Sequence, residues 1–361
     1  MRVDLVDPPA YSPPYDHALA AALAARGATV RLVTSAFAYG EPPAPEGYAR
    51  EQLFYRHALG PAGSRLRALS KRAEHPLDMI RYRRSADADI VHFEWLTIPR
   101  LDLRLLPPRP TVLTIHDPLT RSGEPLRASA FAAVDAIIVH SEYAREQVIA
   151  QHRLEPGRVH VIPHGVITAS SAELPVLPAE LRDSGDPVVL SYGLIRPYKG
   201  IETLLAAWSG IEGAQLWIVG RPMMDLTSIQ RVAPPGVQIV PRFVTSQEQA
   251  ALFERADIVV LPYERSERFG FSGVLGTGLG HGKAILVSDI GGFREVGELG
   301  AGRLVAPADP QAWREALTGV LGDPGARARL AAGAARAAAE QYSWDAIAAA
   351  TLSLYETIAA P

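Results

Sequence analysis

The sequence predicts an α/β protein with two doubly wound parallel sheets, and three observations carry that prediction. Short apolar runs alternate with amphipathic segments along most of the chain, as they do in βαβ units. The alternation stops in a Pro-, Ala- and Leu-rich stretch at 167–187 and begins again at Val188. The chain has 361 residues, which is more than one hydrophobic core usually holds, so two domains are expected.

The first half opens with a βαβ unit, the building block of parallel sheets. Val3–Val6 reads as a short strand, His17–Arg26 as an amphipathic helix stopped by Gly27, and Ala28–Thr34 as the next strand. The later elements of this half are expected as strands at Ile90–Phe93, Thr111–Ile115, Ala136–Val139 and Val159–Pro163, and as helices at Ser64–Arg84, Pro125–Val134 and Glu142–Gln151.

The second half repeats the alternation. Its strands are expected at Val188–Tyr192, Gln215–Val219, Val237–Val240, Ile258–Leu261, Ala284–Val287 and Arg303–Val305. Its helices are expected at Gly200–Trp208, Ser246–Arg255, from Val274 onward, and at Gln311–Leu321, Ala326–Gln341 and Trp344–Ile358. Doubly wound folds bind their ligands beyond the carboxyl ends of the strands, so the loops at those ends are where site residues are expected.

Composition excludes several classes of protein. The net charge of −3 argues against a general nucleic-acid binder. The chain has no cysteine, so a disulfide framework and a thiolate site are excluded. The N-terminal MRVDLVDPPAYSPP lacks the apolar run of a signal peptide, and no stretch approaches the roughly 20 apolar residues of a membrane span. A cytoplasmic location is therefore expected.

Lys199 stands at the most informative position of the chain. It is one of only three lysines, and with Arg196 it lies between the expected strand Val188–Tyr192 and a helix that begins at Gly200. Such strand-to-helix junctions bind phosphate in α/β folds, and a lysine ammonium is a compact charge suited to that task. The alternative is a solvated loop lysine.

Two further loops carry polar residues at the ends of expected strands. His116 and Asp117 follow the strand Thr111–Ile115, either as site residues or as a histidine bonded to a carbonyl and an aspartate that starts a turn. Ser272 and Gly273 precede an expected helix, so their N–H groups and the Ser hydroxyl would face an anion. The alternative for this pair is an ordinary Ser N-cap.

Taken together, in this order and spacing, the motifs resemble a family 4 glycosyltransferase of the GT-B type. The resemblance runs from the first strand to the last helix. The segments that carry it are LAAALAARGATVRLVTS at 19–35, TIHD at 114–117, VHSEYAREQV at 139–148, VIPHGV at 161–166, GLIRPYKGIETLLAAW at 193–208, LWIVGRP at 216–222, ADIVVLPY at 256–263 and FSGVLGTGLGHGKAILVSDIGGFREV at 271–296.

The resemblance implies a GT-B fold, in which two Rossmann-like domains face each other across a cleft. It implies an acceptor-binding domain over 1–170, a nucleotide-sugar-binding domain over 185–342, and a helix over 343–361 that packs back toward the first domain. The implied reaction moves a sugar, with retention, from a UDP- or GDP-linked donor to a saccharide, a lipid-linked glycan or a small molecule. The nucleotide sugar is a co-substrate, so no cofactor and no metal are expected, because cationic side chains neutralise the pyrophosphate.

The resemblance also implies roles for individual residues. Catalysis is expected of His116, which would lie against the donor sugar, and of Arg196 and Lys199, which would neutralise the pyrophosphate. The expected donor-binding residues are Gly193, Arg242, Phe243, Val244, Ser272, Gly273, Val274, Leu275, Thr277 and Glu295. The expected acceptor-binding residues are Tyr15, Asp16, His17 and Asp117.

Some of these roles have structural alternatives. Tyr15, Asp16 and His17 stand in a Pro-rich loop where the family often has a Gly-Gly turn, and Asp16 could instead be the N-cap after a Pro turn. The alternative for Glu295 is a place at the start of a helix. Thr277 stands where the family often has the second glutamate of a Glu-x7-Glu pair, so the ribose contact would be weaker or supplied elsewhere.

A basic segment covers residues 65–84 in the first half, with Arg65, Arg67, Lys71, Arg72, Arg81, Arg83 and Arg84. A solvated helix face is the usual explanation. The alternative is a surface for anionic lipid at the inner face of the membrane. Two rival functions also stay open: another GT-B enzyme such as a sugar-nucleotide 2-epimerase, and a degenerate relative that binds sugar nucleotide without turnover.

Overall fold

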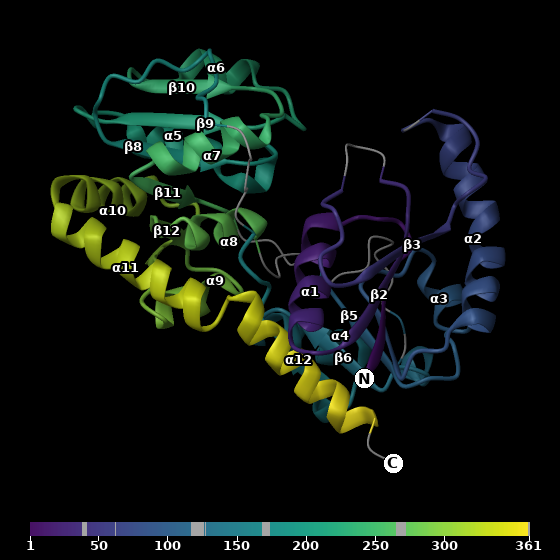
Figure 1. Cartoon of the computed structure of the whole chain (residues 1–361). Helices are drawn as coiled ribbons and strands as arrows, with labels where there is room; N and C mark the ends of the chain where they lie inside the picture. Colours follow the sequence, from purple (N-terminus) through teal and green to yellow (C-terminus); the bar gives the residue numbers. More distant parts are fainter. Residues whose placement is uncertain are drawn as a thin grey trace. The chain divides into compact units, whose positions relative to one another are not determined.

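The computed structural model describes residues 1–37, 42–61, 63–116, 126, 128–167, 174–264 and 272–359. The chain divides into two compact units (Figure 1). Unit 1 comprises Met1–Gly165 together with Trp344–Pro361, and unit 2 comprises Val166–Ser343. Each unit is built on one parallel sheet, which confirms the predicted fold class.

The sheet of unit 1 has seven parallel strands in the order β3-β2-β1-β4-β5-β6-β7. The strands are β1 (Arg2–Asp7), β2 (Thr29–Ser35), β3 (Ala49–Phe54), β4 (Ile90–Phe93), β5 (Thr111–Thr114), β6 (Ala136–Val139) and β7 (Val159–Val161). Strand order reverses between β1 and β4. That switch point is where doubly wound sheets bind ligands.

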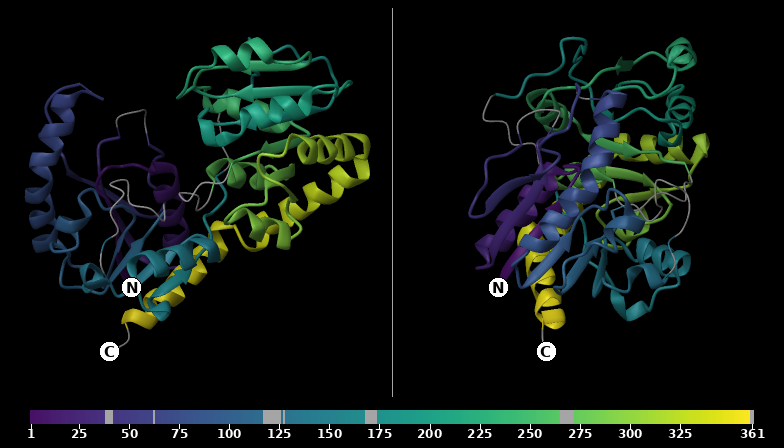
Figure 2. Two further views of the ribbon diagram at one scale, coloured as in Figure 1. Left: turned by 180° about the vertical axis from the view of Figure 1, so that it is seen from behind. Right: turned by 90° about the vertical axis from the view of Figure 1, so that its right-hand side faces the viewer.

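Helices cover both faces of this sheet (Figure 2). They are α1 (Pro13–Ala25), α2 (Arg65–Ser85), α3 (Pro99–Asp102), α4 (Glu142–His152) and α12 (Trp344–Ala359), with 3₁₀ turns η1 (Ala128–Phe131) and η2 (Pro156–Arg158). Met79 and Tyr82 of α2 and Val148 of α4 share one core with Val91 and Phe93 of β4. On the other face, α1 packs against α12.

The C-terminal helix α12 belongs to unit 1, although it follows the last helix of unit 2 in the sequence. The Tyr355 hydroxyl of α12 lies 2.6 Å from Nδ1 of His92 in β4, and Arg26 forms an ion pair with Asp345 at 2.9 Å. A Cβ on Gly165 would lie 2.4 Å from the ring of Trp344, so glycine permits the close approach at the start of α12.

The sheet of unit 2 has six parallel strands in the order β10-β9-β8-β11-β12-β13. The strands are β8 (Val188–Tyr192), β9 (Gln215–Val219), β10 (Val237–Val240), β11 (Ile258–Leu261), β12 (Ala284–Ser288) and β13 (Arg303–Val305). All six were expected within one residue of these bounds. Strand order reverses between β8 and β11.

Two apolar cores lie on the two faces of this sheet, because successive side chains of a strand point to opposite faces. The helices are α5 (Ile201–Trp208), α6 (Thr227–Val232), α7 (Ser246–Arg255), α8 (Gly273–Gly280), α9 (Phe293–Glu298), α10 (Pro310–Gly322) and α11 (Pro324–Glu340), with the 3₁₀ turn η3 (Pro197–Lys199). Leu190 of β8 shares a core with residues of α7, α8 and α11. Its neighbour Val189 shares the other core with residues of α5, α6 and α10.

The structure corrects several of the helices and strands predicted for the first half. Helix α1 begins at Pro13 rather than His17, since proline is well suited to the first helical turn. The described part of 125–134 holds only η1, where the Arg158 guanidinium bonds the carbonyls of Phe131 and Val134 in place of helical N–H groups. The edge strand β3 and the short helices α3, α6 and α9 were not expected, because polar edge strands and single turns carry little periodicity.

Candidate functional site

Lys199 lies at the carboxyl end of the unit 2 sheet, in the turn between β8 and α5. Its side chain is buried, with 9% of the residue exposed. Nζ donates to the hydroxyl of Tyr263 and lies 4.0 Å from the centroid of the Tyr263 ring. The same hydroxyl is 3.2 Å from Oγ of Ser272, the N-cap of α8. One hydrogen-bonded chain therefore joins the loops after β8 and β11, at the switch point.

Among the described residues, no acidic side chain compensates the charge of Lys199. Burial, together with the nearby Arg196 charge, lowers the pKa of Lys199 to about 7. Within the described residues no carboxylate forms an ion pair with it. A buried ammonium is costly unless an anion joins it. This position therefore suits an anionic ligand.

Glycines shape the backbone around Lys199. Gly193 has φ +104°, and a Cβ there would lie 3.1 Å from Cγ2 of Val274 and 3.8 Å from Nζ of Lys199. Gly200 has φ +64°, and a Cβ there would lie 1.9 Å from the carbonyl oxygen of Pro262. Glycine is required at both positions for sterics and for φ. The structure thus brings Gly193, Lys199, Ser272 and Val274 together.

At the N-terminus of α8, a Cβ on Gly273 would meet no atom of the described residues within 4 Å. Oγ of Ser272 lies 3.5 Å from the backbone nitrogen of Leu275, whose side chain is fully buried. The Thr277 hydroxyl is engaged by backbone carbonyls: it lies 3.0 Å from the carbonyl oxygen of Gly273 in the first turn of α8 and 3.3 Å from that of Ile167.

Other predicted donor residues are placed differently. Arg242 follows β10 and forms ion pairs with Glu180 and Glu248, each at 2.6 Å, so its charge is already engaged. Phe243 is 64% exposed, and the Arg221 guanidinium lies 5.3 Å from its ring centroid. The half-buried Val244 packs against the core that contains Leu190. Glu295 lies in the first turn of α9, and Arg196 is the exposed N-cap of η3.

In unit 1, His116 follows β5 at the carboxyl end of the sheet and has both ring nitrogens engaged. Nε2 lies 3.0 Å from Oε2 of Glu94, and Nδ1 lies 3.0 Å from Nε2 of His140. Its ring stacks on that of Trp95, with 4.7 Å between centroids and 15° between planes. Burial lowers the pKa of His116 to about 3, so the imidazole on its own is a poor proton acceptor.

Tyr15 connects this cluster to α1 and α12. Its ring centroid lies 5.0 Å from that of His116, 4.8 Å from that of His164 and 5.1 Å from that of Trp344. Tyr15 is 3% exposed. The expectation that it projects from a loop is wrong, because α1 already includes residue 15 and turns its ring inward.

Asp16 and His17 also lie on α1, so Asp16 is not its N-cap; that position belongs to Ser12. Asp16 is 1% exposed, and burial and the neighbouring Asp7 carboxyl raise its pKa well above the usual range. Asp7 in turn accepts hydrogen bonds from two backbone N–H groups of the loop before α1. Nδ1 of His17 lies 3.0 Å from the hydroxyl of Tyr48. Asp117 lies outside the described residues.

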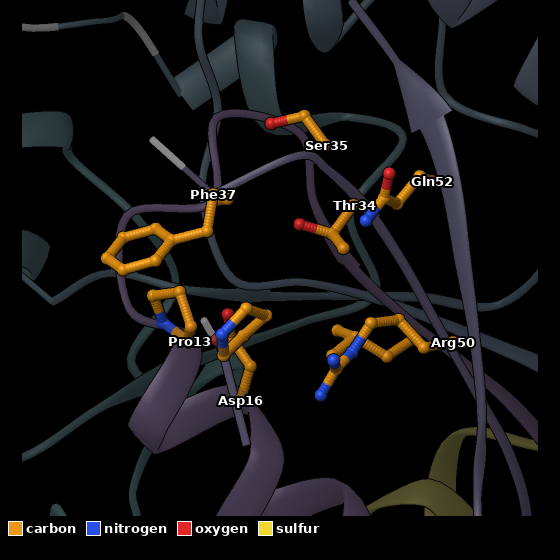
Figure 3. A pocket seen from close by; sticks show the side chains of 10 residues that line it. Pro13, Asp16, Thr34, Ser35, Phe37, Arg50 and Gln52 are labelled. Atoms are coloured by element: carbon orange, nitrogen blue, oxygen red, sulfur yellow. The ribbon is translucent and has the colours of Figure 1, made fainter. Parts of the chain in front are cut away.

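A small pocket lies beside the first turns of α1 (Figure 3). Its lining residues are Ala10, Pro13, Asp16, Leu32, Thr34, Ser35, Phe37, Pro42, Arg50 and Gln52. Nη2 of Arg50 lies 3.0 Å from the Tyr48 hydroxyl, and no carboxylate pairs with Arg50 in the described part of the chain. Oγ of Ser35 is buried and has no hydrogen-bond partner in the described residues. The pocket therefore combines apolar walls with one cation and several hydroxyl or amide groups.

Four residues of the clusters around Lys199 and His116 were not predicted from the sequence: Glu94, Trp95, His140 and Tyr263. Each follows a strand end directly or within two residues, at β4, β6 and β11. Polar or aromatic residues just beyond buried strands were the available signal, but many such residues are structural.

Among the described residues no group of three or more His, Cys, Asp or Glu could hold a metal, and no helix is long and apolar enough to cross a membrane.

Comparisons with known proteins agree with this geometry. Residues 15–170 match the model of Glycosyltransferase Family 4, and residues 186–323 match that of Glycosyl transferases group 1. The chain is 27% identical to a D-inositol 3-phosphate glycosyltransferase of Kineococcus radiotolerans, over 93% of this chain and 88% of that one. It is 30% identical to a phosphatidyl-myo-inositol mannosyltransferase of Mycolicibacterium smegmatis, over 75% and 72%.

The fold is also that of solved glycosyltransferases. The sucrose-phosphate synthase of Thermosynechococcus elongatus superposes with a TM-score of 0.73 at 20% identity, over 99% of both chains. With both halves matched by family models and two GT-B sheets in place, the chain belongs to glycosyltransferase family 4.

Proposed function

We propose that the protein moves a sugar, with retention, from a nucleoside-diphosphate sugar to a hydroxyl of an anionic polyol or saccharide. The observation that supports the donor part of the proposal is the buried Lys199 side chain beside the N-terminus of α8. A diphosphate there would supply a counter-charge, and its leaving-group charge would meet a preorganised cation and helix dipole. These groups can stabilise the leaving diphosphate without a metal.

The part of the proposal that concerns the acceptor rests on the pocket of unit 1. Arg50 offers a cation that forms no ion pair with a carboxylate of the described residues, and Thr34, Ser35 and Gln52 offer hydroxyl and amide groups. A polyol that carries phosphate or carboxylate fits this combination, because arginine recognises such anions through paired N–H groups. The names of the inositol phosphate relatives make inositol phosphate the first acceptor to test.

The test has two stages, each with its own control. Thermal melting with UDP, GDP and their sugar conjugates, with and without EDTA, identifies the donor, because a ligand that binds only the folded state raises Tm. Transfer is then assayed with inositol phosphate and with inositol, and the anomeric configuration of the product is read by NMR. Arg50→Gln should raise KM for the phosphorylated acceptor at least tenfold and leave the donor-induced Tm shift unchanged.

Four outcomes would count against this proposal. An inverted product excludes retention, and loss of donor binding in EDTA excludes metal independence. Release of a free epimerised sugar instead of a transfer product favours the 2-epimerase class. Nucleotide binding without turnover on any acceptor favours a degenerate relative.

We also propose that α2 contacts anionic membranes. Leu66, Leu69 and Leu77 are 57–66% exposed and share one face of the helix at their spacing. Basic side chains flank them along the same helix, and apolar anchors with basic neighbours bind anionic lipid surfaces. Leu69→Glu should reduce sedimentation with phosphatidylserine vesicles at least threefold, whereas equal sedimentation of this variant and the wild type would exclude the surface.

A further inference from the structure

Glu94, His116 and His140 form a buried chain whose hydrogen bonds restrict where protons can be. Nδ1 of His140 lies 3.0 Å from the carbonyl oxygen of Ile162, which only accepts, so this nitrogen carries a hydrogen. Nε2 of His140 faces Nδ1 of His116, and Nε2 of His116 faces Oε2 of Glu94, each at 3.0 Å. Each of these two contacts needs one hydrogen between its two atoms.

Counting hydrogens along the chain leaves one proton to place. If both histidines are neutral, the His140 bond to Ile162 makes its Nε2 an acceptor, so Nδ1 of His116 must donate. Nε2 of His116 is then a lone pair that faces a carboxyl oxygen. The contact with Glu94 holds only if one more proton sits on the carboxyl or on an imidazole. Whether this proton is on Glu94 or on a histidine, the net charge of the three side chains together is zero.

We propose that this proton resides on Glu94, and that Glu94 is the positioning residue that fixes the tautomer and orientation of His116. The neutral arrangement avoids burying a carboxylate and an imidazolium in a site where Glu94 is fully buried. Among the described residues, Oε1 of Glu94 forms no hydrogen bond of good geometry, with Nε2 of His92 at 3.5 Å, although burial raises the pKa of Glu94 and the nearby Thr114 hydroxyl offsets that rise in part. A poorly paired carbonyl oxygen costs less than a poorly paired carboxylate oxygen.

The electrostatic environment favours the same location. Burial raises the pKa of Glu94, and burial lowers the pKa values of His116 and His140 to about 3. The other titratable groups that face the cluster are Asp7 of β1, Tyr15 and Asp16 of α1, His92 of β4, His164 after β7 and Tyr355 of α12.

Protein groups occupy both ring nitrogens of His116 while the cluster is intact. His116 contributes a fixed, uncharged ring between the Trp95 face and the Tyr15 edge. A substrate hydroxyl that reached His116 would have to displace Glu94 or His140 first.

Infrared and NMR spectra of the ligand-free protein test this placement directly. The wild type at pH 7 should show the C=O band of a protonated carboxyl that Glu94→Gln abolishes, and ¹⁵N NMR should show His116 as the neutral Nδ1–H tautomer. Asp16→Asn is the matched control, because Asp16 should contribute a separate protonated-carboxyl band. An unchanged carboxyl band in Glu94→Gln, or an imidazolium at His116, would overturn the proposal.

Stability supplies a second readout. The glutamine amide can donate to His116 as the protonated carboxyl does, so Glu94→Gln should keep the wild-type Tm within about 2 °C between pH 6 and 8, whereas Glu94→Ala should lower Tm by about 5 °C. Equal losses in the two variants would contradict a donating Glu94. Neither measurement uses a substrate, so a failed transferase assay and a failed Glu94 assignment are separate results.

Discussion

Replacing Lys199 with methionine should stabilise the protein while it removes donor binding. The pKa of Lys199 is lowered from 10.5 to about 7, chiefly by burial. At about 1.4 kcal/mol for each pH unit between these values, the buried charge costs up to about 5 kcal/mol at pH 6. Methionine fills a similar volume without the charge. The Tyr263 hydroxyl, which loses Nζ, still has Oγ of Ser272 at 3.2 Å.

The stability that Lys199→Met gains over the wild type should fall as the pH rises. The folded-state pKa lies below the unfolded one, so between pH 7 and 10.5 the unfolded chain binds more protons, and wild-type stability gains from rising pH across that window. The advantage of Lys199→Met should therefore be largest below pH 7. It should shrink to about 2 kcal/mol at pH 9 and vanish above pH 10.5.

Urea unfolding at pH 6 and pH 9 measures this difference. Lys283→Met is the matched control: burial also lowers the pKa of Lys283, but this side chain is only half-buried and donates to the Glu254 carbonyl, so its loss should stabilise the fold much less. Calorimetric titration of the nucleotide sugar into the wild type should show proton uptake and about tenfold weaker binding at pH 8 than at pH 6. A Lys199→Met variant less stable than the wild type at pH 6 would refute the reasoning.

Two glycine substitutions test the close approaches. Gly200→Ala should weaken donor binding at least tenfold and lower the free energy of unfolding by about 3 kcal/mol, because its Cβ would overlap the Pro262 carbonyl. Gly210→Ala is the control: φ at Gly210 is similar at +83°, but a Cβ there meets no atom of the described residues within 4 Å. This substitution should lower the free energy of unfolding, measured in urea, by only about 1 kcal/mol. Gly165→Ala should destabilise unit 1 by about 1–3 kcal/mol through the Trp344 ring, and an unchanged Tm would contradict that packing.

Some predictions from the sequence agree with the structure and others are wrong. Most strands were predicted within a residue or two, because the alternation of apolar runs is a local property. Gly193, Lys199, Ser272 and Val274 were predicted as one site and lie together. In contrast, Asp16 and Tyr15 were expected in a loop, but a helix that starts at Pro13 buries both.

The sequence by itself determined that the chain has two parallel α/β sheets and that a scarce lysine stands where a strand gives way to a helix. Only the tertiary structure decided what surrounds that lysine and His116. Tyr263 lies 64 residues beyond Lys199, and Glu94 lies 22 residues before His116. Such pairs meet because strand order places β8 beside β11 and β4 beside β5. Strand order depends on how whole units pack, which the periodicity of a single segment does not encode.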